Sequence, residues 1–138
     1  TMHGDGELEE GQIWEAVMFA GAKKVDNLVS TVDLNRQQID GTTTQVMDLG
    51  DLQQKFTAFG WMVMTIENGN DVQQVLDGMA KAKSLTGKGH PVCVLLKTEM
   101  GYGVDFMQGT NKYHGSVLNE DDLAKALAQL DETELGDF

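Results

Sequence analysis

The amino-acid sequence predicts an α/β fold in which a parallel sheet is flanked by helices. Short apolar or β-branched segments alternate with segments in which apolar residues recur every three or four positions. The 138 residues suit a single domain, and no linker, repeat or low-complexity block divides them. Strands joined by helical crossovers pair in parallel, and such a sheet holds its ligands beyond the carboxyl ends of its strands.

The expected elements follow one another along the chain. Apolar spacing predicts helices over residues 11–24, 49–59, 72–83 and 123–130. Strands are expected over residues 27–33, 61–67 and 92–97. The last of these strands, Val-Cys-Val-Leu-Leu-Lys, is a continuous apolar run of the kind that is buried on both faces of a sheet.

The segments between these elements are polar or rich in glycine. Residues 36–44 contain the turn signal Asp40-Gly41, and Asp71 is the expected N-cap of the helix that follows it. Residues 98–119 are rich in Gly, Asn and Tyr, and long loops of this kind in a compact domain are usually functional or mobile.

Charge and cysteine content exclude several classes of protein. Ten Lys and Arg against 22 Asp and Glu give a net charge of −12, so a basic nucleic-acid footprint and a polybasic membrane patch are both absent. No apolar run approaches the roughly 20 residues of a membrane span, and the first residues show no signal-peptide pattern. A lone cysteine, Cys93, favours a reduced, cytoplasmic setting. We expect Cys93, Trp14 and Trp61 to pack in the core.

The tripeptide Gly4-Asp5-Gly6 places a carboxylate between two residues without side chains. Glycines let backbone N–H groups approach a phosphate, and a helix that follows directs its positive end at that anion. The Asp oxygen is a ligand of the kind that Mg²⁺ prefers. Taken alone, the tripeptide is more often a tight surface turn. Only three residues precede it, so the strand that delivers it is expected to be missing or truncated.

Asn35 changes this interpretation. It follows the strand predicted at 27–33, with 28 residues between Gly6 and Asn35. The helix and strand between them return the chain to the same edge of the sheet, where the Asn oxygen and a nearby backbone carbonyl can join Asp5 on one metal ion. A Gly-Asp-Gly turn, a helix, a strand and an Asn in this order resemble the signature of thiamine-diphosphate-binding enzymes.

Longer segments resemble the diphosphate-binding domain of transketolase: residues 4–16, 33–41, 55–61, 97–104 and 113–115. They occur in the family order and span nearly the whole chain, and the likeness is greatest to transketolases whose N-terminal region is a separate polypeptide. The resemblance implies a thiamine-diphosphate-binding fold that is incomplete at its N-terminal side. We assign residues 1–130 to this partial domain and residues 131–138 to an acidic tail.

The resemblance also implies a metal site and a diphosphate site. Asp5 and Asn35 would be side-chain ligands of Mg²⁺ or Ca²⁺, with the backbone carbonyl of Gln37 as a third ligand. Gly4 and Gly6 belong to the cofactor-binding turn, and Gly6 would contact the diphosphate of thiamine diphosphate through its N–H group.

Two further residues match family positions with catalytic roles. His114 matches the histidine beside the diphosphate and the substrate entrance. Glu10 matches an acidic residue of the dimer interface that helps connect the paired cofactor sites. Without the resemblance, His114 would be assigned to the surface and Glu10 to a solvated helix start stabilised by the helix dipole. His3 and His90 fall outside the family pattern.

The implied function is part of a transketolase, a transferase that moves a two-carbon ketol unit between sugar phosphates in carbohydrate metabolism. Because the earlier part of the domain and the other two domains of the family are not in this sequence, we expect no turnover by the chain alone. An exposed sheet edge invites pairing, so the expected partners are further copies of the chain or complementary transketolase chains. The segment Gly69-Asn70-Asp71 departs from the Gly-His-Asp of the family, and His3 stands where an apolar or small residue is usual.

Two alternatives stay open. Deoxyxylulose-phosphate synthase and the first components of dehydrogenases share the Gly-Asp-Gly and Asn pattern, although residues 38–41 and 113–115 favour transketolase. From a different class, the chain could be a non-catalytic α/β module that serves oligomerisation or regulation.

Overall fold

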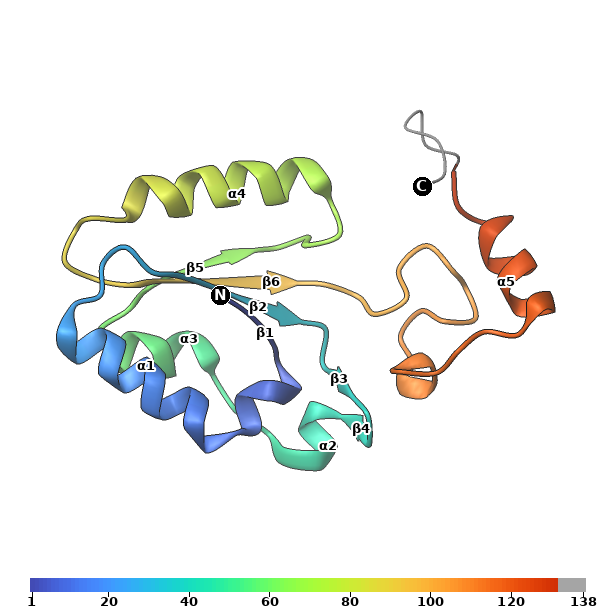
Figure 1. Ribbon diagram of the computed structural model, residues 1–138, viewed down its shortest axis with the longest axis horizontal. Coiled ribbons are helices and arrows are strands. Elements are labelled where there is room, and N and C mark those ends of the chain that lie inside the picture. The colour runs from blue at the N-terminus through green and yellow to red at the C-terminus, as the bar shows by residue number, and fades with distance from the viewer. Residues whose placement is uncertain (132–138) are drawn as a thin grey trace.

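Four parallel strands form the centre of the molecule, in the order β1-β2-β6-β5 (Figure 1). The computed structural model describes residues 1–131. Its sheet consists of β1 (Met2–Gly4), β2 (Val29–Leu34), β6 (Val92–Lys97) and β5 (Met62–Ile66). The apolar strand β6 lies between β2 and β5, and four of its six residues are buried. The predicted parallel sheet is therefore confirmed.

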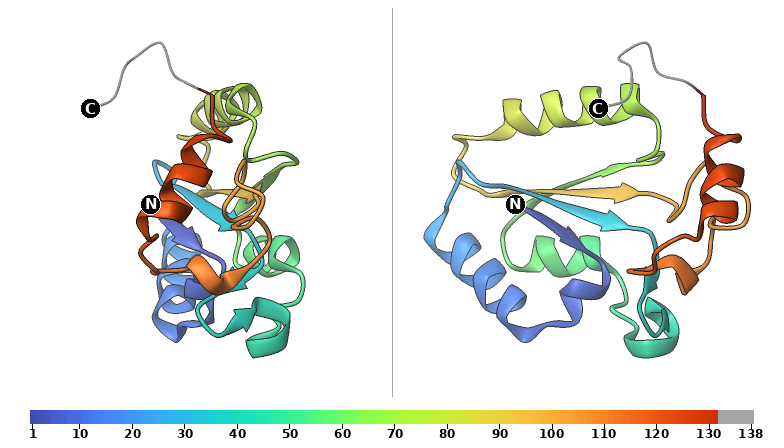
Figure 2. Two further views of the ribbon diagram at one scale, coloured as in Figure 1. Left: turned by 90° about the vertical axis from the view of Figure 1, so that its right-hand side faces the viewer. Right: turned by 45° about the vertical axis from the view of Figure 1, so that its right-hand side comes forward.

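The helices of the described residues surround this sheet. They are α1 (Gly11–Lys23), α2 (Thr43–Met47), α3 (Leu52–Ala58), α4 (Val72–Leu85) and α5 (Glu120–Leu127), with 3-10 turns η1 (Gly6–Glu9) and η2 (Asn111–Tyr113). The helices α1 and α3 cover one face, and α4 covers the other (Figures 1 and 2). The segment after β6, with η2 and α5, lies beyond the carboxyl ends of the strands (Figure 2). Within residues 1–131, every helix is too short or too polar to cross a membrane.

Local caps explain where the helix ends differ from the prediction. The Asp51 carboxylate accepts a hydrogen bond from the Gln54 N–H, so α3 begins after Asp51 and not at residue 49. The Asn119 side chain caps α5 in the same way, so this helix covers 120–127 and not 123–130. Apolar spacing reports which face of a helix is apolar, whereas caps set its first residue. Of the predicted acidic tail, residues 132–138 lie outside the described residues.

The segment predicted as a polar loop at 36–44 contains a small hairpin, formed by β3 (Gln37–Gln38) and β4 (Gly41–Thr42). Helix α2 follows it directly. Thr42 and Gln45 form a capping box at the start of α2, since each side chain bonds the backbone of the other residue. This Thr-x-x-Gln spacing is the feature of the sequence that could have indicated α2.

The strand expected to be missing or truncated before Asp5 is present as β1. It has three residues and pairs in parallel with β2, with Gly4 opposite Asp33. Within the described part of the chain, its other edge has no strand partner. Met2 on this strand is 74% exposed.

The core between the sheet and helices α1 and α3 is built around Phe56, which is fully buried. Its ring centroid lies 5.5 Å from those of Trp14 and Trp61. The Trp61 indole N–H donates to the Val17 carbonyl at 2.9 Å. Cys93 is also fully buried in this cluster, and burial raises the pKa of its thiol to about 12. The predicted core positions of Trp61 and Cys93 are confirmed, and Trp14 is partly buried and packs against this core.

We expect Gly21→Ala to destabilise the fold. This is opposite to the helix propensities of the two residues, since alanine in a helix is normally more stable than glycine by about 1 kcal/mol. Helix α1 approaches the C-terminal end of α3 so closely that a Cβ on Gly21 would lie 1.8 Å from the Phe59 carbonyl oxygen. Such overpacking lowers the free energy of unfolding by about 1–3 kcal/mol or more. Gly11→Ala in the same helix is the matched control, because a Cβ there meets nothing within 4 Å. Urea denaturation measures both variants, and equal effects at the two positions would contradict the prediction.

Candidate functional site

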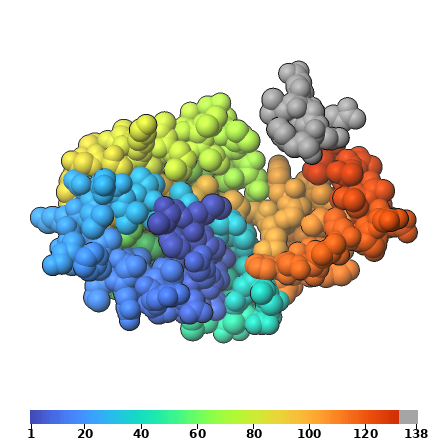
Figure 3. Space-filling view, viewed as in Figure 1, coloured from blue at the N-terminus to red at the C-terminus, as the bar shows by residue number. Residues whose placement is uncertain are grey.

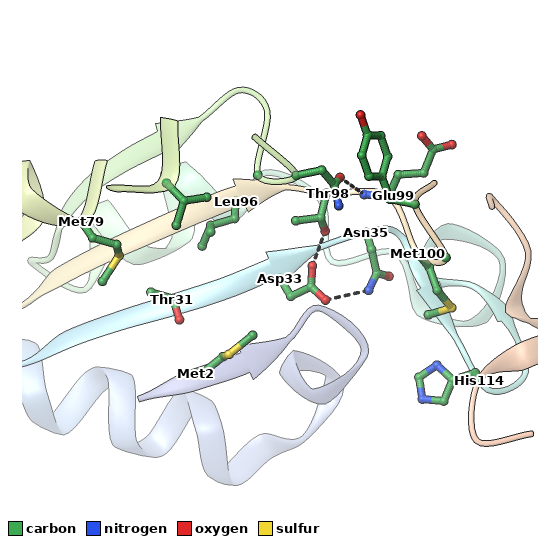
Figure 4. A pocket seen from close by; sticks show the side chains of 15 residues that line it. Met2, Thr31, Asp33, Asn35, Met79, Leu96, Thr98, Glu99, Met100 and His114 are labelled. Atoms are coloured by element: carbon green, nitrogen blue, oxygen red, sulfur yellow. Dashed lines mark hydrogen bonds between the residues drawn. The ribbon is translucent and has the colours of Figure 1, made fainter. Parts of the chain in front are cut away.

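Three loops meet at the carboxyl edge of the sheet. Asp5 follows β1, Asn35 follows β2, and Thr98 follows β6. The Asp5 N–H donates to the Asp33 carbonyl at 3.1 Å, and the Thr98 hydroxyl donates to the Asp33 carboxylate (Figure 4). The predicted meeting of Asp5 and Asn35 at one edge of the sheet is confirmed.

Asp5 is the buried polar centre of this edge, with 1% of its surface exposed. One carboxylate oxygen accepts from the Gly6 N–H at 2.9 Å, and the other accepts from the Arg36 N–H at 2.6 Å. Arg36 adopts the left-handed conformation with φ of 63°, which is costly for a residue other than glycine. The bond to Asp5 and a second bond, from the Thr43 N–H to the Arg36 carbonyl, hold it there.

The environment of Asp5 disfavours its negative charge. Burial raises the pKa of the Asp5 carboxyl above its usual value, and the nearby charge of Asp33 adds to the increase. The two backbone N–H bonds act in the opposite direction but do not cancel the effect of burial. Among residues 1–131, no Lys or Arg side chain forms an ion pair with Asp5. A buried carboxylate without a cationic side chain is a suitable ligand for a metal ion.

We expect the stability that Asp5 contributes to fall as the pH rises when divalent cations are removed. A carboxyl whose folded-state pKa is raised stabilises the fold while protonated, and this contribution is lost as the pH rises through the raised pKa. Urea denaturation in a chelator between about pH 4 and pH 7 should therefore show wild type losing stability relative to Asp5→Asn. Parallel pH profiles for the two proteins would contradict this expectation.

Asn35 is half-buried beside Asp5 and is held at both ends of its amide. Its Nδ2 donates to Asp33 at 3.0 Å, and its Oδ1 accepts from the Gln37 N–H at 2.8 Å. The Gln37 side chain in turn contacts the Gly109 carbonyl at 3.5 Å, which ties the hairpin to the loop after β6.

A cavity of about 480 Å³ contains all the residues predicted to bind the cofactor or the metal, namely Gly4, Asp5, Gly6, Asn35, Gln37 and His114. Its wall also carries three further carboxylates, Glu7, Asp33 and Asp40, but no Lys or Arg of the described chain. His114 is exposed at the rim. Glu10 is outside the cavity: it is exposed at the N-cap of α1, and its side chain makes no capping bond. The role of Glu10 stays a prediction.

The Gly6 turn differs in detail from the expected phosphate-binding turn. Asp5 caps the short 3-10 helix η1, and α1 begins only at Gly11, so the positive end that directly follows Asp5 belongs to η1. The Gly6 N–H donates to the Asp5 side chain. A Cβ at Gly6 would also lie 2.9 Å from the Cβ of Gln38, so close packing against the hairpin requires glycine there.

The donor set at this cavity fits a hard divalent cation. Within residues 1–131, no three His, Cys, Asp or Glu side chains are grouped so that they could hold a metal ion. The predicted ligands are instead one carboxylate, one amide oxygen and one backbone carbonyl. Mg²⁺ and Ca²⁺ accept such oxygens and fill their remaining positions with water or phosphate oxygens. The donors therefore suit Mg²⁺ or Ca²⁺ better than Zn²⁺.

A larger cavity of about 870 Å³ adjoins the first on the α4 side of the sheet. Asp33, Asn35 and His114 line both cavities. The remaining wall is largely apolar, with Met79 of α4 and Leu96 of β6 facing it (Figure 4). The space-filling view shows the surface hollowed between the α4 layer and the segment after β6 (Figure 3).

Two polar positions near this cavity were not assigned from the sequence. Asn70, from the segment that departs from the family pattern, accepts a hydrogen bond from the Glu99 N–H at 2.8 Å and helps to hold the loop after β6. Thr98 lies within a segment that matches the family, but no pattern in the sequence indicates its bond to Asp33.

The fold is that of an α/β domain in which loops that carry polar side chains converge at one edge of a parallel sheet. Residues 1–133 match the family described as "Transketolase, thiamine diphosphate binding domain". The chain therefore belongs to the transketolase family.

Curated relatives agree with this assignment. The chain is 40% identical over 131 residues to 6-deoxy-6-sulfo-D-fructose transketolase subunit SqwG of Clostridium sp. (strain MSTE9), a match that covers 95% of this chain and 46% of the relative. It is 36% identical over 132 residues to an apulose-4-phosphate transketolase subunit of Phocaeicola vulgatus, a match that covers 96% of this chain and 46% of that relative. The chain thus spans about half the length of these relatives.

Solved transketolases share the fold. The structure from Campylobacter jejuni superposes with a TM-score of 0.82 at 30% identity, over 93% of this chain and 20% of that one. The structure from Leishmania mexicana superposes with a TM-score of 0.83 at 34% identity, over 92% of this chain and 18% of that one.

Proposed function

We propose that this chain supplies the cation- and diphosphate-binding part of a transketolase. In this proposal Asp5, Asn35 and the Gln37 carbonyl hold Mg²⁺ or Ca²⁺, which in turn binds the diphosphate of thiamine diphosphate. The observation that carries it is the shared cavity: Asp5 and Asn35 are far apart in the sequence, yet both line it together with Gln37.

The charges of the cavity support a role for the cation. Among residues 1–131, four carboxylates and no Lys or Arg line the wall, so a bare diphosphate would be repelled. A divalent cation held by Asp5 offsets this repulsion. The backbone at Gly4 leaves room for phosphate oxygens, since even a Cβ there would meet nothing within 4 Å.

His114 is the side chain best placed to act on a bound molecule. It stands at the rim of the first cavity and also lines the larger one, and its backbone N–H is fixed by the Asn111 carbonyl at 3.0 Å. A histidine there can donate a hydrogen bond to a phosphate or accept one from a sugar hydroxyl. Bound thiamine diphosphate supplies the electron sink for transfer of a two-carbon ketol unit.

The proposed activity belongs to a larger assembly. Relatives named as transketolase subunits are about twice as long as the matched region. We propose that the chain acts with complementary transketolase chains or as a homo-oligomer, on sugar phosphates, and that it gives no ketol transfer alone. Glu10 on the surface and the free edge of β1 are the proposed contact regions.

Calorimetric titration of the 138-residue chain with thiamine diphosphate tests this proposal. We expect heat of binding in Mg²⁺ and none in a chelator, and we expect Asp5→Asn to remove the response. Glu15→Gln, an exposed carboxylate on α1 outside both cavities, is the charge-matched control. Equal binding with and without Mg²⁺ would contradict the proposed site. Absence of binding even with complementary transketolase chains would favour a non-catalytic module.

A further inference from the structure

Asp33 joins the ends of two neighbouring strands at the boundary between the two cavities. It belongs to β2, and its Oδ1 accepts from the hydroxyl of Thr98, which directly follows β6. Its Oδ2 accepts from Nδ2 of Asn35 at 3.0 Å (Figure 4). Each oxygen of the Asp33 carboxylate therefore has its own side-chain donor, one from the residue just after β2 and one from the residue just after β6.

These contacts leave the Asn35 amide a single orientation. An amide carries a donor at one end and an acceptor at the other, and a half-turn exchanges them. Here Nδ2 faces a carboxylate, which only accepts, and Oδ1 faces the Gln37 N–H at 2.8 Å, which only donates. The reversed amide would place acceptor against acceptor and donor against donor. The Asn35 oxygen is therefore held beside Gln37.

We propose that Asp33 and Thr98 are positioning residues that fix the Asn35 oxygen for the cation. This inference rests on the proposed function, which assigns that oxygen and the Gln37 carbonyl to the metal. Asp33 acts through Asn35, and Thr98 acts through Asp33 by holding the carboxylate in place. An aspartate is needed at position 33 because both of its oxygens must accept, whereas the nitrogen of an asparagine cannot.

The matched pair Thr98→Val and Thr98→Ser tests the proposal with no change in charge. Valine removes the hydroxyl at similar size, and serine retains it. We expect Thr98→Val to weaken Mn²⁺ binding about tenfold to a hundredfold, as loss of a supporting residue does in other metal sites, and Thr98→Ser to bind like wild type. Free Mn²⁺, counted by electron paramagnetic resonance, gives the dissociation constants.

Asp33→Asn provides a second variant, and we expect it to weaken Mn²⁺ binding at least as much as Thr98→Val. A second readout needs no metal: the side-chain amide resonance of Asn35 in a ¹H–¹⁵N spectrum. We expect this resonance to shift in Thr98→Val and to stay in place in Thr98→Ser. A role limited to folding would lower the melting temperature without producing this pattern.

The outcomes separate this inference from the proposed function. Mn²⁺ binding by Thr98→Val that equals wild type overturns the positioning role and leaves the proposed function standing. Equal losses in Thr98→Val and Thr98→Ser also overturn it, because the hydroxyl would then not be the cause. A loss confined to Asp33→Asn would assign the effect to charge and overturn the role of Thr98. Absence of Mn²⁺ binding by wild type overturns both proposals.

Discussion

Replacing Asp5 by alanine is expected to weaken the binding of Mg²⁺ or Mn²⁺ by at least about 100-fold, the upper end of the losses seen when only a supporting residue is removed. Among the described residues that line the cavity, Asp5 is the one fully buried carboxylate, and its side chain is the proposed charged ligand. Isothermal titration calorimetry with the cation alone measures the effect without any turnover.

The same substitution is expected to destabilise the fold. Alanine leaves the N–H groups of Gly6 and Arg36 without their acceptor, and since both bonds are part-buried, each loss costs up to about 1–3 kcal/mol. Asp5→Asn keeps one acceptor oxygen and separates the two effects, since it should fold better than Asp5→Ala and still bind the cation poorly. The control is again Glu15→Gln. Cation affinity in Asp5→Asn equal to that of the control would contradict the assignment.

Phe56→Ala is expected to lower the free energy of unfolding by about 3–5 kcal/mol. Phe56 is fully buried, and its ring packs between those of Trp14 and Trp61. The loss is a large share of the roughly 5–15 kcal/mol that stabilises a typical domain. Urea denaturation followed by tryptophan fluorescence suits the measurement, because both tryptophans flank the new cavity.

Phe19→Ala is the matched control for this core prediction. Phe19 lies on α1 and is 60% exposed, so its removal should change stability by only a few tenths of a kcal/mol. Phe56→Leu is a milder core variant that keeps the chain folded if alanine does not. A loss at Phe56 no greater than that at Phe19 would contradict the described packing.

Elements with strong local signals were predicted well. Residues 92–97 form an apolar run that begins after Pro91 and ends at a lysine, and β6 has these bounds. Helix α4 starts where predicted because Asp71 caps it through the N–H groups of Gln73 and Gln74. By contrast, the leucines that marked α5 are largely exposed, Leu123 at 47% and Leu127 at 61%, so their spacing reported an apolar face but not the bounds of the helix.

The meeting of Asp5 and Asn35 was predictable because parallel strands bring their carboxyl ends to one edge. The hydrogen bonds and backbone conformation that hold these two side chains in place were not predictable. The bond between Thr98 and Asp33 joins residues 65 positions apart, and it depends on β2 and β6 being neighbours in register. The left-handed backbone of Arg36 carries no signal in the sequence, because a glycine would be the expected residue for that conformation.

The two cavities have a wall in common, made by Asp33, Asn35 and His114. Any ligand that reorients Asn35 from one side also alters the binding site on the other side. Thermodynamic linkage makes such an influence mutual: the factor by which an occupant of the larger cavity changes cation affinity is the factor by which the cation changes the affinity of that occupant. The apparent dissociation constant of a ligand in one cavity would then depend on whether the other cavity is occupied.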